Sequence, residues 1–182
     1  MTPYIALLRG INVGGNNKIP MKELCSLLEA AGFETVKTYI QTGNLFFHHI
    51  SLFPKDVAEI ISSLIKTEFG FKPSVLVLTV SEYKKALDGN PYPEAEEQPK
   101  AVHLYFLEQR ALEPNIEKLT ELKATSETFH LTDAVFYLHA PDGIGRSKLA
   151  AKVEKILGVP TTARNWRSAV NTLALVCATN TA

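Results

Sequence analysis

The feature that most constrains the fold is an order of strand, helix, strand, strand and helix that occurs twice along the 182 residues. Apolar residues recur at helical spacing after Pro20 and again after Pro54, and Gly32 and Gly70 follow these two segments. Proline favours the first turn of a helix and glycine its end, so both helices have clear boundaries. The elements predicted in the first half are a strand at 4–8, a helix at 20–31, strands at 35–40 and 45–48, a helix at 54–69 and a strand at 75–80.

The second half repeats this order up to its last element. A polar, proline-rich segment at 90–100 predicts a linker, which gives an N-terminal unit at 1–89 and a C-terminal unit at 101–182. The closing strand is replaced in this prediction by a C-terminal helix around Trp166. The elements predicted here are strands at 102–107, 128–131 and 135–139, helices at 114–122 and 147–157, and the last helix.

This order predicts an α+β fold made of two tandem ferredoxin-like β-α-β-β-α units packed together, with an extra C-terminal helix. A right-handed crossover makes the first two strands of a unit parallel, with the third strand antiparallel between them. In the first unit, the loop after the first strand and the hairpin at 41–44 then leave the same end of the sheet. We therefore expect Arg9–Lys18 and Gln41–Asn44 to be neighbours.

Composition narrows the possible partners and the compartment. Lys plus Arg and Asp plus Glu both number 19, so the net charge is zero, whereas proteins that grip nucleic acid backbones are usually basic. Nucleic acid binding would therefore need a local patch of basic residues. Cys25 and Cys177 lie on apolar helical stripes and are expected to be buried free thiols. No signal peptide or membrane-spanning run is visible, so we expect a cytoplasmic protein without membrane contact, and we expect no metal.

Two loops carry the residues best suited to bind a ligand. In the segment from Arg9 to Lys18, glycines let backbone N–H groups approach an anion at the start of a helix, and two cations add charge. The same residues also suit a long turn with no ligand. The candidate ligand contacts here are Arg9, Asn12, Gly14, Gly15, Lys18, Gln41 and Asn44.

The second loop, at 141–148, also ends where a helix is expected to start. Its arginine can pair with a phosphate or carboxylate through two hydrogen bonds, or the cations can simply be solvated while Ser147 caps the helix. The segment at 164–167 has a similar ambiguity, since its tryptophan is either a core residue or a stacking surface. The candidate ligand contacts here are Arg146, Lys148, Arg164, Asn165 and Trp166.

Four motifs together resemble the signatures of the bacterial family called domain of unknown function 1697. They are ALLRGINVGG at 6–15, TYIQTGN at 38–44, PDGIGRSKL at 141–149 and TARNW at 162–166. Thr42 stands where the family usually has serine and keeps the hydroxyl group. The resemblance implies a cytoplasmic ferredoxin-like protein of two subdomains and brings no established activity, cofactor or catalytic residue.

Three functions are compatible with these patterns. The leading hypothesis is a small binding protein or enzyme for an anionic ligand, such as a nucleotide or other phosphate ester, held by the basic glycine-rich loops. The first alternative is a nucleic acid binding module that uses the same loops with Trp166 as a stacking residue. The second is a non-catalytic interaction or regulatory protein in which the loops are structural. Catalytic residues, cofactor and oligomeric state stay open, as does the question of whether Arg9 and Arg146 share one pocket.

Overall fold

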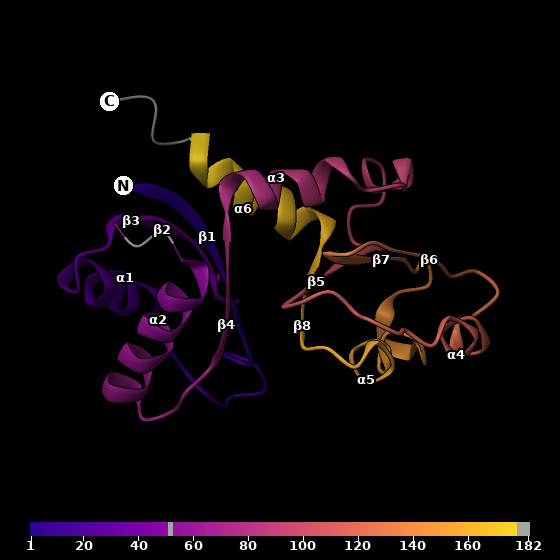
Figure 1. The fold of residues 1–182 in the computed structure, drawn as a ribbon, viewed down its shortest axis with the longest axis horizontal. Coiled ribbons are helices and arrows are strands. Elements are labelled where there is room, and N and C mark those ends of the chain that lie inside the picture. The colour runs from indigo at the N-terminus through magenta and orange to yellow at the C-terminus, as the bar shows by residue number, and fades with distance from the viewer. Residues whose placement is uncertain (51–52, 178–182) are drawn as a thin grey trace. The chain divides into compact units, whose positions relative to one another are not determined.

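The computed structural model describes residues 1–50 and 53–177, and it forms a mixed α/β protein with two compact units (Figure 1). One unit consists of Met1–Lys85 with Val170–Ala182, and the other of Ala86–Ala169. Each unit contains a four-stranded antiparallel sheet. No helix within the described residues is long and apolar enough to cross a membrane.

The first unit follows the order of elements expected from its sequence. Its elements are β1 (Thr2–Arg9), α1 (Met21–Ala30), β2 (Glu34–Tyr39), β3 (Asn44–His49), α2 (Pro54–Phe69), β4 (Ser74–Thr79) and the first part of α3 (Val80–Asp88). The strands lie in the order β2-β3-β1-β4, and every neighbouring pair is antiparallel. As predicted, β3 lies between β1 and β2.

The second unit has a closing strand that was not predicted, and the predicted C-terminal helix around Trp166 follows it as α6. Its elements are the 3-10 turn η1 (Pro93–Ala95), β5 (Val102–Leu107), α4 (Ile116–Leu122), β6 (Thr128–Leu131), β7 (Val135–His139), the 3-10 turn η2 (Ile144–Arg146), α5 (Val153–Leu157), β8 (Thr161–Asn165) and the start of α6 (Trp166–Cys177). The strand order is β6-β7-β5-β8. Strand β8 is short, polar and at the sheet edge, so its sequence lacks the apolar alternation that marks a strand.

The helix expected at 147–157 is also shorter than predicted. Residues 148–152 form turns, and only Val153–Leu157 is helical before Gly158 ends the segment in the left-handed conformation. The apolar residues of the predicted stripe are nevertheless buried, because Leu149 and Val153 are fully covered and Leu157 nearly so. The apolar pattern therefore predicted correctly which side chains are buried. It predicted the helical backbone correctly only for Val153–Leu157.

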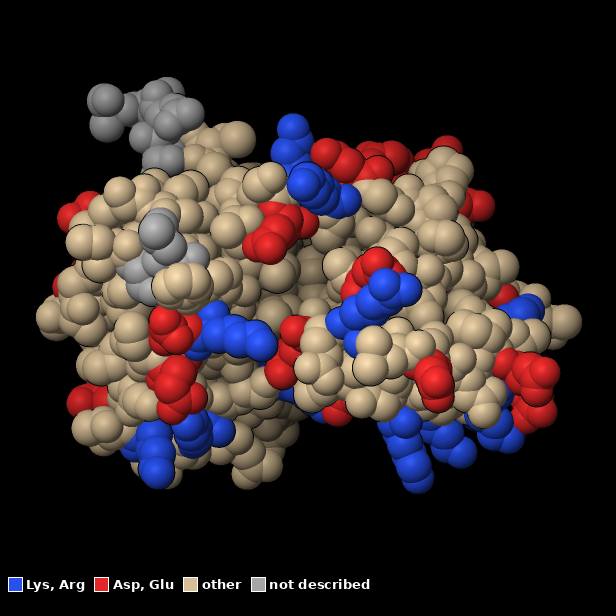
Figure 2. All heavy atoms as spheres, in the orientation of Figure 1, with Lys and Arg blue, Asp and Glu red and all other residues tan. Residues whose placement is uncertain are grey.

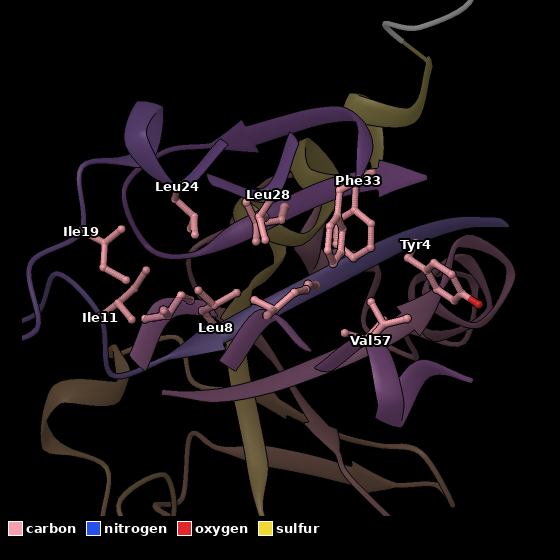
Figure 3. Packing of buried hydrophobic residues seen from close by; sticks show 14 residues of the cluster. Tyr4, Leu8, Ile11, Ile19, Leu24, Leu28, Phe33 and Val57 are labelled. Atoms are coloured by element: carbon pink, nitrogen blue, oxygen red, sulfur yellow. The ribbon is translucent and has the colours of Figure 1, made fainter. Parts of the chain in front are cut away.

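One apolar core of the first unit lies between its sheet and the helices α1 and α2 (Figure 3). Tyr4, Ala6 and Leu8 alternate along β1 and share this face of the sheet with Phe47 of β3. At one end of the cluster, Ile11 and Ile19 lie together, one near each end of the loop between β1 and α1. The loop is therefore anchored to the core at both of its ends.

The central strands of this sheet are buried on both faces. Ile5 and Leu7 alternate with the residues just described, and both are fully buried. On β3, Phe46 is 1% exposed and points to the same side as these two residues. The Leu45–Phe47 aromatic segment thus serves core packing, as predicted, rather than presenting an open aromatic surface of the kind that RNA-recognition sheets use.

The two cysteines differ in their environments. Cys25 is half-buried in α1, and burial raises the pKa of its thiol while a hydrogen bond to the Thr38 side chain acts in the opposite direction. Cys177, in the last turn of α6, is exposed. The prediction of two buried thiols was therefore wrong for Cys177, where the apolar stripe of the helix does not extend to the last residue.

Candidate functional site

A pocket of about 350 Å³ lies where the loop after β1 meets the start of α1 and the hairpin between β2 and β3. Four residues predicted as ligand contacts line it, and three apolar residues complete its wall. The predicted residues are Asn12, Gly15, Lys18 and Gln41, and the apolar residues are Ile19, Pro20 and Met21. The structure therefore brings the two predicted segments of the first unit together at one depression.

The side chain of Asn12 holds this pocket in shape. Its Nδ2 donates hydrogen bonds to the carbonyl oxygen of Ile19 at 3.0 Å and to that of Gln41 at 2.8 Å, while its Oδ1 accepts one from the Ile19 amide at 2.8 Å. Both donors and one lone pair of the amide are thus used inside the protein. Asn12, which was predicted to contact a ligand, lines the pocket, and its hydrogen bond to Gln41 joins the loop to the hairpin.

The tip of the loop is a tight turn made of two glycines. Val13 and Asn16 form an antiparallel bridge, and Gly14 and Gly15 between them have φ values of 59° and 80°. Two central residues with positive φ are the requirement of a two-residue turn of type I′, which explains why glycine occupies both positions. Asn17 closes the other side, since its Nδ2 donates to the carbonyl oxygen of Gly10 at 2.9 Å.

The hairpin approaches β1 closely through Gly43. Its carbonyl oxygen accepts a hydrogen bond from the Leu8 amide at 2.8 Å, and a Cβ atom at this glycine would lie 2.6 Å from the Leu8 Cβ. Together with the bond from Asn12 to Gln41, this contact confirms that Arg9–Lys18 and Gln41–Asn44 are spatial neighbours. The backbone of Gly43, with φ of 77°, is also in the left-handed region that favours glycine.

The pocket has a positive character. Among the described residues that line it, Lys18 is the one that carries a charge, and its side chain is exposed. Helix α1 starts beside it at Met21, and no side chain caps the N-terminal turn of this helix. The unpaired N–H groups of a helix N-terminus carry partial positive charge, which attracts anions. Lys18 and this helix end therefore act in the same direction.

The remaining predicted residues of the first unit do not line this pocket. Arg9 is the exposed last residue of β1 and pairs with Ser74 across the sheet. Asn44 is fully buried, and its Nδ2 donates to the Tyr39 carbonyl oxygen and to the Thr42 Oγ1. The amide of Asn44 thus closes the hairpin turn, and its side chain is not accessible from outside.

In the second unit, the predicted residues occupy two separate segments. Arg146 ends the 3-10 turn η2 and Lys148 follows it, and both are exposed. Between them, Ser147 is buried, and its Oγ accepts a hydrogen bond from the Ala150 amide at 2.9 Å. The serine therefore caps a turn, which agrees with its predicted capping role although no helix follows at once.

At the start of α6, two of the predicted side chains form hydrogen bonds with backbone groups of neighbouring residues. Asn165 caps the helix, since its Oδ1 accepts a hydrogen bond from the Ser168 amide at 2.8 Å. Trp166, the first residue of α6, is half-buried. Arg164 is partly exposed in β8, and its Nη1 donates to the Ala163 carbonyl oxygen at 2.8 Å.

A second pocket, of about 370 Å³, lies in this unit beside the start of the 141–148 loop. Pro141 and Gly143 line it, but its cations are Lys100 and Arg167 rather than Arg146 and Lys148. Neither lining cation was among the predicted ligand contacts, although Arg167 belongs to the 164–167 segment interpreted above. Arg167 directly follows the TARNW motif, so its position was the available signal, whereas Lys100 lies in a segment interpreted only as a linker.

Several buried titratable groups of the second unit lie in its sheet. Burial raises the pKa of Tyr105 and of Tyr137 to about 12, and the nearby Glu127 carboxylate adds to the effect at Tyr105. Burial lowers the pKa of His103, whose Nδ1 has no hydrogen-bond partner. In the described ranges, no group of three His, Cys, Asp or Glu side chains is placed to hold a metal ion.

Comparison with protein families gives a match over residues 1–137 to the family described as Protein of unknown function (DUF1697). The chain belongs to this family. The match contains the loop after β1 and the β2-β3 hairpin, and therefore all the residues that line the first pocket. It ends before the 141–149 and 162–166 motifs, so the second pocket lies only partly within it.

A solved structure, that of the conserved bacterial protein SP0830 from Streptococcus pneumoniae, is similar to this chain with a TM-score of 0.67. The two chains are 23% identical, and the similarity covers 96% of this chain and 98% of that one. At this identity the likeness concerns the fold. Comparison with curated proteins gives no match.

Proposed function

We propose that the pocket braced by Asn12 binds a small anionic ligand, such as a nucleotide or other phosphate ester, on a fold of two ferredoxin-like units. The observation that carries this proposal is the placement of Lys18 beside the uncapped start of α1 in one depression. Phosphate groups bind well at such helix ends because N–H groups and the helix dipole both favour negative charge.

The lining residues have distinct roles in this proposal. Lys18 supplies the charge, and the exposed side chain of Gln41 supplies a neutral amide that donates to or accepts from the ligand. Gly15 allows close approach of the backbone, because it carries no side chain. Asn12 has a positioning role, since its own hydrogen bonds are already made within the protein.

The charge distribution favours a small anion over nucleic acid. Figure 2 shows acidic and basic side chains interspersed over the visible face, in keeping with 19 residues of each sign. Binding to a nucleic acid backbone uses several cations at once, and one lysine at a pocket does not supply them. A single cation beside a helix N-terminus suits one phosphate group.

The test is a titration of the protein with inorganic phosphate and with a nucleoside monophosphate, followed by calorimetry or by amide chemical shifts. We expect Lys18→Met to weaken the binding of both by roughly tenfold or more, because a charged hydrogen bond contributes about 1.5–3 kcal/mol. The matched control is Lys22→Met. Lys22 is exposed in the first turn of α1 but lines a different depression, with Glu23 and Ser26. Equal affinities of the two variants would contradict the proposal, as would an absence of binding to the unaltered protein.

A further inference from the structure

The charges of the second unit are unevenly distributed along its chain. Residues 86–140 contain ten Asp and Glu and four Lys and Arg, whereas residues 141–169 contain two Asp and Glu and six Lys and Arg. The two parts offset each other in the composition of the whole unit. The excess of cations in residues 141–169 is therefore a local feature, which the balanced total charge does not reveal.

Four of these cations form most of the exposed surface of one segment, which runs from the end of η2 through the following turns into α5. From position 146 to position 155, the exposed residues are Arg146, Lys148, Ala151, Lys152 and Lys155. We call the four cations among them the basic stripe. Figure 2 shows Lys and Arg side chains along the lower edge of this unit, below α4 and α5 in the orientation of Figure 1.

The backbone of this segment places the lysines of the basic stripe on one side. The amides of Ala151 and Ile156 donate to carbonyl oxygens four residues earlier, at 3.3 and 3.0 Å, so the spacing stays close to that of a helix. Intervals of four and three residues lie on the same side of a helix, and these intervals separate Lys148, Lys152 and Lys155. The apolar residues of the same segment form its buried side.

The two acidic residues of residues 141–169 make hydrogen bonds elsewhere. Asp142 accepts from the Ser126 hydroxyl at 2.6 Å, and Glu154 accepts from the Thr161 amide at 2.9 Å. Within the part of the chain that the structure describes, no acidic side chain forms an ion pair with a cation of the basic stripe. Like charges at such short spacing repel one another, and an anionic partner would remove this repulsion.

The exposed side of the segment fits one kind of anionic partner best. Leu149, Val153 and Leu157 are buried, so the basic stripe offers charge without an adjoining row of exposed apolar side chains. Binding to a membrane surface combines cations with an apolar face, and protein interfaces have an apolar or aromatic centre. Binding to a nucleic acid backbone depends chiefly on several cations that contact phosphate groups.

We propose that the basic stripe binds the phosphate backbone of a nucleic acid without reading its sequence. This function is separate from the anion pocket of the first unit and uses none of the residues that line it. Each of the four cations contacts one phosphate group and displaces counterions, so the affinity depends strongly on salt.

The experiment measures the binding of a labelled DNA duplex of about 20 base pairs by fluorescence anisotropy, at about 50 and 200 mM salt. With four phosphate contacts, we expect the affinity of the unaltered protein to fall by about a hundredfold over this range. The triple variant Lys148→Gln, Lys152→Gln and Lys155→Gln keeps one contact. Its affinity at low salt should be about tenfold weaker or less, and should fall only about fourfold at high salt. An RNA duplex is the second probe, because it carries the same phosphate groups.

The matched control removes three exposed lysines of the first unit and lowers the net charge equally. It carries Lys55→Gln, Lys66→Gln and Lys84→Gln. We expect this variant to keep both the affinity at low salt and the hundredfold fall, within about threefold. Replacement of the three lysines of the basic stripe by arginine preserves their charge and should preserve the affinity to the same degree.

The outcomes decide between the possible partners. If neither duplex binds the unaltered protein at low salt, the inference is overturned, and the same holds if the glutamine variant of the basic stripe binds as tightly as the control. Tighter binding to vesicles of phosphatidylserine and phosphatidylcholine than to both duplexes would also overturn it, in favour of a membrane surface. Lys18→Met should leave duplex binding unchanged, so this inference and the proposed function can fail separately.

Discussion

The loop between β1 and α1 and the loop between β7 and α5 are alike in composition and differ in what holds them. Both are rich in glycine and carry an arginine and a lysine. In the first, the amide side chains of Asn12 and Asn17 bond to backbone groups of residues seven and more positions away. In the second, Ser147 bonds to Ala150, three positions away, and Asp142 accepts from the Ser126 hydroxyl, 16 positions away. The longest such bond of the first loop, from Asn12 to Gln41, spans 29 positions.

The cations of the two loops also lie in different surroundings. The first loop is held against the hairpin by Asn12, and its lysine lines the depression that results. The 3-10 turn of the second loop leaves Arg146 and Lys148 exposed, while the adjoining pocket takes its cations from other segments. Two glycine-rich loops that each carry an arginine and a lysine thus place their cations differently.

The strongest test of this contrast replaces one glycine in each region by alanine. Gly43 and Gly143 have φ values of 77° and 84°, but a Cβ at Gly43 would lie 2.6 Å from the Leu8 Cβ, whereas nothing lies within 4 Å of one at Gly143. We expect Gly43→Ala to lower the free energy of unfolding by about 3 kcal/mol or more, and Gly143→Ala by about 1 kcal/mol from backbone strain alone. Urea unfolding followed by circular dichroism measures both. Similar losses in the two variants would show that the hairpin does not pack tightly on β1.

A smaller effect is expected when the bracing side chains themselves are changed. Asn12→Asp removes both donors and places a carboxylate against the carbonyl oxygens of Ile19 and Gln41, so we expect a loss of about 2 kcal/mol. Aspartate tolerates the left-handed backbone of this position, where φ is 54°, and the loss would therefore report on the hydrogen bonds.

The counterpart in the second loop is Ser147→Ala, which removes one acceptor and should cost about 1 kcal/mol. Chemical shifts of the backbone amides locate each perturbation. We expect Asn12→Asp to shift signals in both the β1-α1 loop and the hairpin, and Ser147→Ala to shift only nearby ones. A response confined to the β1-α1 loop in Asn12→Asp would contradict its bracing role.

Much of the fold was predictable where several signals agreed. Helix α2 combines a proline at its start, apolar residues at helical spacing and Gly70 in the left-handed conformation at its end, and its predicted bounds match. Strand β8 was missed because Thr161 and Thr162 are its buried residues, so the apolar pattern is absent. The position of β8 depends on pairing with β5, a long-range contact that local sequence does not encode.

The position of the candidate site was predictable from the sequence, whereas the roles of its individual residues were less so. Topology alone placed the loop after β1 beside the hairpin, and four of the seven residues named there line the pocket. The roles of Asn12 and Asn44 were not predictable, because an asparagine that braces a turn and one that contacts a ligand have the same sequence context.

The smallest expected effect is a decrease in stability at high pH, which arises from the buried tyrosines of the second sheet. The pKa of Tyr105 is raised to about 12 by burial and by Glu127, whereas a tyrosine in the unfolded chain has its ordinary value of about 10. Above pH 10 the unfolded chain therefore loses this proton before the folded protein does, so stability falls as the pH rises from about 10 to 12. At pH 11 the loss due to Tyr105 is at most about 1.4 kcal/mol.

The variant Tyr105→Phe isolates this contribution. Phenylalanine keeps the edge-on contact with Phe136 and removes the ionisable group. The free energy of unfolding, measured in urea at pH 8 and pH 11, should decrease less in the variant than in the unaltered protein, by about 1 kcal/mol. Lysines and the other tyrosines titrate in both proteins, so their contribution cancels in the comparison. An equal decrease in the two proteins would mean that the Tyr105 hydroxyl is as well solvated in the folded protein as in the unfolded chain, and that this part of the second sheet opens to water.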